Sequence, residues 1–160
     1  MADPFSVASG TVGIISLGLT VAQGLFRIAD GIGSAGEEVR SHAEEINAFS
    51  RLLCQVKTEL ERSITISPDI QSVINDVLGI CKRVLKPLNG LQSTLQPLLE
   101  HFKSSPRKLL QLGLRIRWLF HVKGKVLFYW NVVKEQHRLL DTILAIVTLH
   151  STRARCPQDK

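Results

Sequence analysis

The side chains that most often bind metals or act as nucleophiles are scattered through this sequence. Its five histidines never stand three or four residues apart, the spacing that places two ligands on one face of a helix. The phosphate-loop, H-E-x-x-H and G-x-S-x-G motifs do not occur either. We therefore predict a non-enzymatic protein with no catalytic, cofactor-binding or metal-binding residues and no small-molecule substrate.

The cysteines indicate a reducing compartment. Cys54, Cys81 and Cys156 are an odd number without C-x-x-C spacing, so neither a disulfide framework nor a zinc site is indicated. Cys54 and Cys81 fall within apolar periodic runs. We therefore predict that these two are small core residues, since a free cysteine behaves as a small hydrophobic side chain.

Positive charge is concentrated in the second half of the chain. Residues 1–80 carry five Lys or Arg against ten Asp or Glu, whereas residues 81–160 carry fifteen against four. The densest stretch has no acidic residue, and its predicted anionic-lipid ligands are Lys103, Arg107, Lys108, Arg115, Arg117, Trp118, Lys123 and Lys125. We rank an anionic lipid surface above nucleic acid, because no DNA- or RNA-binding signature accompanies the charge. A solvated face of the protein ranks close behind lipid.

The segment from Phe5 to Phe26 contains no charged residue and is long enough to cross a bilayer core, which takes about 20 residues. Its predicted membrane-inserting side chains are Phe5, Val7, Val12, Ile14, Ile15, Leu17, Leu19, Val21, Leu25 and Phe26. Ser16, Thr20 and Gly24 form a stripe of small residues of the kind that lets membrane helices approach closely. The alternative is a buried core helix. The two states are compatible if the helix is packed at rest and released on activation.

The segment from Gly31 to Gly36 matches the G-x-G-x-x-G pattern of dinucleotide-binding proteins. That fingerprint requires a preceding strand within a βαβ unit, whereas the residues before Gly31 have the length and composition of a helix. We instead expect Gly33 to end the first helix. Ser34 is then expected to cap the second helix and Glu37 to complete a capping box.

Apolar residues recur every three or four positions along the chain, and no stretch alternates as a strand does. Helices are expected at about 4–32, 35–62, 68–102, 107–120 and 125–152, before a polar tail at 153–160. The third is expected to be one helix kinked at Pro87 and Pro97, in preference to two helices broken near Asn89-Gly90. A turn at 123–125 is expected to precede the last helix. The predicted fold class is all-α: one bundle domain over residues 1–152, with four long helices, one short helix and an apolar N-terminal helix.

Three features together resemble a known family. They are the opening Met-Ala-Asp-Pro-Phe-Ser-Val-Ala-Ser-Gly, the Gly-rich apolar helix, and Arg117-Trp118-Leu-Phe120 before a Lys-rich turn and a long Val/Leu helix. They resemble the fungal N-terminal domain of STAND receptors, which precedes NACHT or NB-ARC regions in fungal NOD-like proteins. The resemblance covers about residues 1–152. This family is similar to HeLo and HeLo-like domains, so the resemblance implies a helical bundle that oligomerises and disrupts membranes in programmed cell death or heterokaryon incompatibility.

These signals predict an effector or signalling domain that needs no cofactor. We expect it to rest in the cytoplasm and to be recruited to the plasma membrane, with anionic lipids, further copies of itself or like helical domains as partners. One alternative is a helical interaction or adaptor domain that never inserts into a membrane. A third interpretation is a basic module that binds nucleic acid.

Overall fold

The computed structural model describes residues 4–62, 67–101 and 107–155, and each of these residues except Ser67 is helical. The elements are α1 (Pro4–Ile32), the 3-10 turn η1 (Gly33–Gly36), α2 (Glu37–Arg62), α3 (Pro68–His101), α4 (Arg107–Arg117), the π-helical segment η2 (Trp118–Val122) and α5 (Lys123–Arg155). The prediction of an all-α protein with four long helices and one short helix is confirmed.

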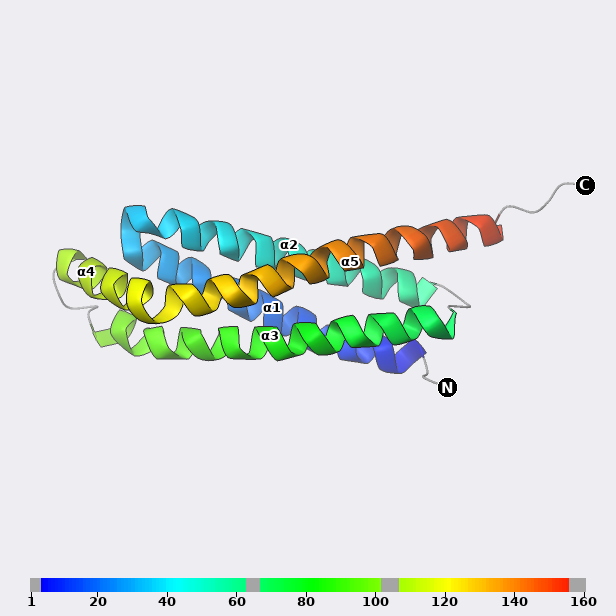
Figure 1. Cartoon of the computed structure of the whole chain (residues 1–160), viewed down its shortest axis with the longest axis horizontal. Helices are drawn as coiled ribbons and strands as arrows, with labels where there is room; N and C mark the ends of the chain where they lie inside the picture. Colours follow the sequence, from blue (N-terminus) through cyan, green and yellow to red (C-terminus); the bar gives the residue numbers. More distant parts are fainter. Residues whose placement is uncertain (1–3, 63–66, 102–106, 156–160) are drawn as a thin grey trace, which may run out of the picture.

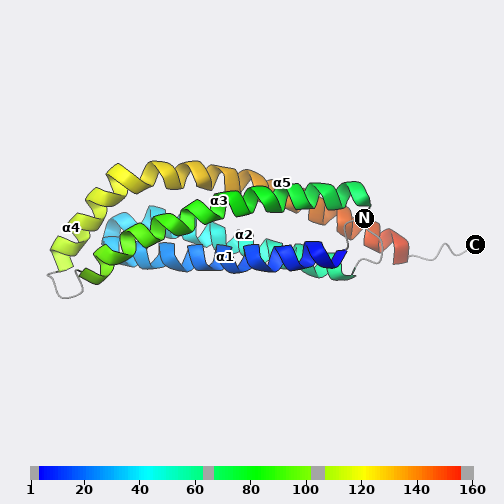
Figure 2. The same ribbon diagram turned by 90° about the horizontal axis from the view of Figure 1, so that it is seen from below.

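The helices form an elongated bundle built from two antiparallel hairpins (Figure 1). One hairpin is α1 with α2, and the other is α3 with α5; α4 lies at the end where α3 and α5 are joined. Figure 2 shows the two hairpins as stacked layers. Helix α1 packs mainly on α2 and α3, and α5 packs on the same two helices from the other side. Helices α1 and α5 therefore lie diagonally opposite each other.

A glycine turn allows α1 and α2 to pack closely. Gly33 has a positive φ of 72°, a left-handed conformation that costs glycine nothing, and α1 ends just before it, as predicted. Gly36 lies against the Ala29 carbonyl, where a Cβ atom would overlap the backbone. Helix α2 then begins with Glu37 and Glu38 in its first turn, where carboxylates interact favourably with the helix dipole. The predicted cap, Ser34, has a side chain outside those that the structure describes.

Helix α3 begins at Ser67-Pro68 as predicted. The backbone N–H of Asp69 donates to the Ser67 hydroxyl over 3.3 Å, and the N–H of Gln71 donates to the Ser67 carbonyl over 3.1 Å. Proline suits the first helical position, because its missing N–H would have no partner inside the helix. The helix then continues as one element through Pro87 and Pro97, and Figure 2 shows it curving along its length.

The predicted turn at 123–125 is wrong. The chain remains helical from Arg107 to Arg155, and the five-residue segment η2 joins α4 to α5 with a wider helical turn. The N–H of Lys123 donates to the Trp118 carbonyl across this turn. Such a bulge inserts one residue without ending the helix. It keeps Trp118, Val122 and Val126 buried against the bundle, and their burial outweighs the helix-breaking tendency of Gly124.

Apolar side chains from all four long helices fill one core. The largest fully buried side chains include Val21 and Ile32 of α1, Ile46, Phe49 and Leu53 of α2, Ile74, Leu85, Leu88 and Leu95 of α3, and Leu140 of α5. Cys81 belongs to this core as predicted, and burial raises the pKa of its thiol to about 12. The prediction for Cys54 is wrong, because its side chain is exposed on the outer face of α2.

Candidate membrane-binding surface

Helix α1 presents one face to the core and one to solvent. Among the predicted inserting side chains, Ile14, Val21 and Leu25 are buried, Ile15, Leu17 and Phe26 are half-buried, and Val12 and Leu19 are exposed; Phe5 and Val7 have side chains outside the described set. Within the span from Gly10 to Ile32, the most apolar stretch of 18 residues has a mean hydropathy of 1.6, and 39% of that stretch is buried. By length and composition this span can cross a membrane. The same features also suit the core helix that it forms here.

The small-residue stripe of α1 faces α3 and the solvent beside it. Ser16 and Thr20 are exposed, and the Thr20 hydroxyl donates to the Ser16 carbonyl over 2.9 Å. Gly24 lies beneath the Gln92 side chain, which donates its amide N–H to the Val21 carbonyl. A polar groove of about 400 Å³ runs along this contact. Within the bundle, the stripe therefore accommodates a polar side chain of α3.

Two of the predicted lipid ligands contact other helices of the bundle. The Arg115 guanidinium donates to the Ile32 carbonyl at the end of α1 over 3.2 Å. The Lys123 ammonium lies 2.9 Å from a Glu38 carboxylate oxygen at the start of α2. The last carbonyls of a helix have no partners within it and carry partial negative charge, so a guanidinium is favourable there. Arg115 and Lys123 thus stabilise the turn between α1 and α2.

The remaining predicted ligands differ in accessibility. Lys108, Arg117 and Lys125 are exposed. Trp118 is only 3% exposed, so its indole belongs to the core in this conformation and is not available to a headgroup. Lys103 lies outside the described residues, and Arg107 has a side chain outside them. In the part of the chain that the structure describes, the predicted set therefore contributes three freely accessible cations.

Helix α4 carries an exposed apolar stripe that the sequence analysis missed. Leu109, Leu112 and Ile116 are 50–57% exposed, and their spacing of three and four residues places them on one face of the helix. Lys108 and Arg117 flank this stripe. Apolar residues occur all around α4, so the period alone does not identify which face is outward. Only the packing of α4 against α1 and α3 decides it.

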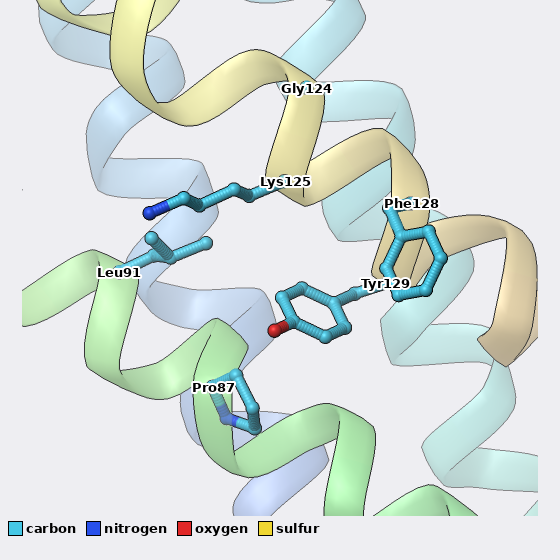
Figure 3. A pocket seen from close by; sticks show the side chains of 6 residues that line it. All are labelled: Pro87, Leu91, Gly124, Lys125, Phe128 and Tyr129. Atoms are coloured by element: carbon cyan, nitrogen blue, oxygen red, sulfur yellow. The ribbon is translucent and has the colours of Figure 1, made fainter.

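A shallow pocket lies between α3 and the start of α5 (Figure 3). It measures about 370 Å³ and is lined by Pro87, Leu91, Gly124, Lys125, Phe128 and Tyr129. Figure 3 shows Lys125 extending over Leu91 with the Tyr129 hydroxyl pointing the same way. Phe128 and Tyr129 meet edge to face, with ring centroids 5.4 Å apart. An apolar floor with one cation at its rim suits an anionic amphiphile.

Two contacts between a histidine and an aromatic ring join α2 to α5. His42 of α2 lies 5.2 Å from Trp130 of α5, and seven residues further along each helix Phe49 lies 6.0 Å from His137. His42 is buried, and neither of its ring nitrogens has a hydrogen-bond partner among the residues that the structure describes. This burial lowers its pKa below the usual 6.5; the carboxylates of Glu38 and Glu45 oppose the shift, and the Lys123 ammonium adds to it.

Acidification is therefore expected to weaken the packing of α2 on α5. Because the pKa of His42 is lower in the folded state, the unfolded chain binds the proton more readily, and the free energy of unfolding falls as the pH drops below about 6.5. Urea unfolding at pH 8 and pH 5.5 measures this fall. A His42→Leu variant should show a smaller fall than wild type, whereas His121→Leu, which alters an exposed histidine, should behave as wild type. An equal fall in all three proteins contradicts the assignment.

The fold and the surface together define an all-helical bundle with a basic, apolar face at one end. Among residues 4–62, 67–101 and 107–155, no three His, Cys, Asp or Glu side chains lie close enough together to hold a metal ion. No protein-family model, curated protein or solved structure matches the chain.

Proposed function

We propose that this protein is a non-enzymatic bundle that docks on anionic membranes through α4. The observation that carries the proposal is the exposed stripe of Leu109, Leu112 and Ile116 between the exposed cations Lys108 and Arg117. A helix with an apolar face and a basic border lies in the plane of a membrane interface. Fully burying one leucine contributes about 1.5–3 kcal/mol, and each cation near an anionic surface adds about 1 kcal/mol.

Docking through α4 would also weaken the hold on α1. Arg115 and Lys123 contact Ile32 and Glu38 at the α1–α2 turn, and both cations belong to the segment that meets the membrane. Lipid phosphates would compete with these partners, since charge-assisted bonds to phosphate are strong. We propose that this competition favours release of α1, whose span from Gly10 to Ile32 is apolar enough to insert.

The cellular setting follows from the resemblance to the fungal N-terminal domain of STAND receptors. In that setting the protein would be the output domain of a receptor, or a stand-alone relative, resting in the cytoplasm and acting at the plasma membrane in cell death. A nucleic-acid partner would use the same cations. The exposed Leu and Ile side chains of α4 favour lipid, because a phosphate backbone offers them no apolar surface.

Sedimentation with vesicles tests the docking surface. Wild-type protein is expected to bind vesicles containing phosphatidylserine and not purely zwitterionic vesicles. Leu112→Glu should weaken binding about 10- to 100-fold, through the lost burial of one leucine. Val73→Glu is the matched control: it adds the same charge at an exposed apolar position near the start of α3 and should bind nearly as wild type. Figure 1 shows that α3 starts at the end of the bundle opposite α4.

Two results would overturn the docking proposal. One is equal weakening by Leu112→Glu and Val73→Glu, which would leave charge alone responsible. The other is a complex with bare DNA or RNA that survives physiological salt while vesicles remain unbound, which would favour the nucleic-acid interpretation.

A further inference from the structure

Helix α5 carries a second apolar face, on the part of the helix that follows the α3–α5 pocket. Leu139, Ile146 and Leu149 of this face are 40–70% exposed. Their spacing follows a heptad, with Leu139 and Ile146 at one repeating position and Leu149 three residues beyond. The inward face is separate, because Val126, Val133, Leu140 and Val147 are buried at their own seven-residue spacing.

This outer face is open to solvent. From Leu139 to Leu149 it covers about 15 Å of helix at 1.5 Å per residue. Figure 1 shows the C-terminal end of α5 projecting past the neighbouring helices. Helical faces with apolar residues at heptad spacing bury them by pairing with another helix, with side chains interdigitating along the seam.

We propose that the outer face of α5 pairs with the same face of a second copy of this chain, with the two helices antiparallel. Charged residues on this outer face favour a second copy as the partner and an antiparallel arrangement of the two helices. Glu135 and Arg153 belong to the same heptad pattern as the apolar residues of the outer face, and both are exposed. In the antiparallel register that places Leu139 opposite Leu149, Thr142 faces Ile146 and Glu135 faces Arg153. A two-fold axis repeats each of these contacts.

The alternatives are disfavoured by the same residues. A parallel pair in register would place Glu135 on Glu135 and Arg153 on Arg153, and like charges in a helical seam are destabilising. An anionic membrane would meet the Glu135 carboxylate on this outer face, at a cost in both repulsion and desolvation. In the monomer Glu135 pairs with its own neighbour Arg138, at 2.9 Å on the surface, and an exposed pair of this kind contributes little.

The mass in solution is the first test. Light scattering of wild-type protein over a concentration series is expected to approach twice the chain mass of 17.8 kDa. Ile146→Glu should shift the protein to monomer, whereas Val73→Glu should leave the dimer intact; circular dichroism checks that both variants remain helical. A wild-type protein that stays monomeric at its highest soluble concentration would overturn the proposal, even if it binds vesicles.

Charge reversal then tests the register. Glu135→Arg and Arg153→Glu should each weaken the dimer about tenfold, because each converts two symmetric attractions into repulsions, and the double variant should recover wild-type affinity. Both single variants leave the number of like-charge contacts unchanged in a parallel pair. Single reversals without effect, or a double variant as weak as the singles, would therefore overturn the antiparallel arrangement.

Discussion

A Gly18→Cys/Ser50→Cys double variant, once oxidised, is expected to bind anionic vesicles as the reduced protein does and to release none of their contents. Gly18 of α1 lies against α2, and a Cβ atom at position 18 would stand 3.5 Å from the Cβ of Ser50. Disulfides join Cβ atoms about 3.5–4.5 Å apart, so this pair is placed to form one. The bond would lock α1 to α2 without touching α4.

The locked variant separates docking from release. Closing the loop between positions 18 and 50 should also raise the free energy of unfolding by about 3–4 kcal/mol, which a urea titration measures. Exposed Cys54 is changed to Ser beforehand, as is Cys156, which lies outside the described residues. Cys81 can stay, because it is buried and its raised pKa of about 12 leaves it without reactive thiolate.

Dye release from phosphatidylserine vesicles is the decisive measurement, with the same sample after reduction as the control. Release restored by reduction supports the departure of α1 from the bundle. Equal release before and after reduction would show that α1 does not leave, while the docking role of α4 would still be judged by sedimentation alone.

Phe49→Ala is expected to lower the free energy of unfolding by about 3–5 kcal/mol. Phe49 is fully buried on α2 and lies beside His137 of α5, so removing its ring leaves a cavity that the packed helices cannot close. The matched control is Phe128→Ala at dilute concentration, which deletes the same ring from an exposed position and should change stability by about 0.5 kcal/mol or less.

The same variant links stability to the proposed release of α1. A less stable bundle opens more often, so dye release should be faster for Phe49→Ala than for wild type. Phe49→Leu keeps most of the side-chain volume and should fall between the two. A Phe49→Ala protein that stays folded and stable, or that is destabilised yet releases dye more slowly, would contradict this link.

The amino-acid sequence by itself determined where helices begin and end at most boundaries. Ser67-Pro68 starts α3 and Gly33 ends α1, because these residues act on the dihedral angles and hydrogen bonds of their immediate neighbours. The core faces of α2 and α3 were also predictable, since their polar residues occupy the opposite faces and leave one apolar side.

Only the tertiary structure decided which side of α1 and α4 faces solvent and what the basic residues do. Both helices have apolar residues on more than one side, so their local pattern fits several orientations. The packing partners select one orientation: α4 exposes Leu112, and η2 buries Trp118 while carrying the helix through to α5. Arg115 likewise reaches Ile32 only because the bundle brings together residues far apart in sequence. The candidate surface therefore depends on contacts between helices, which no local pattern of residues specifies.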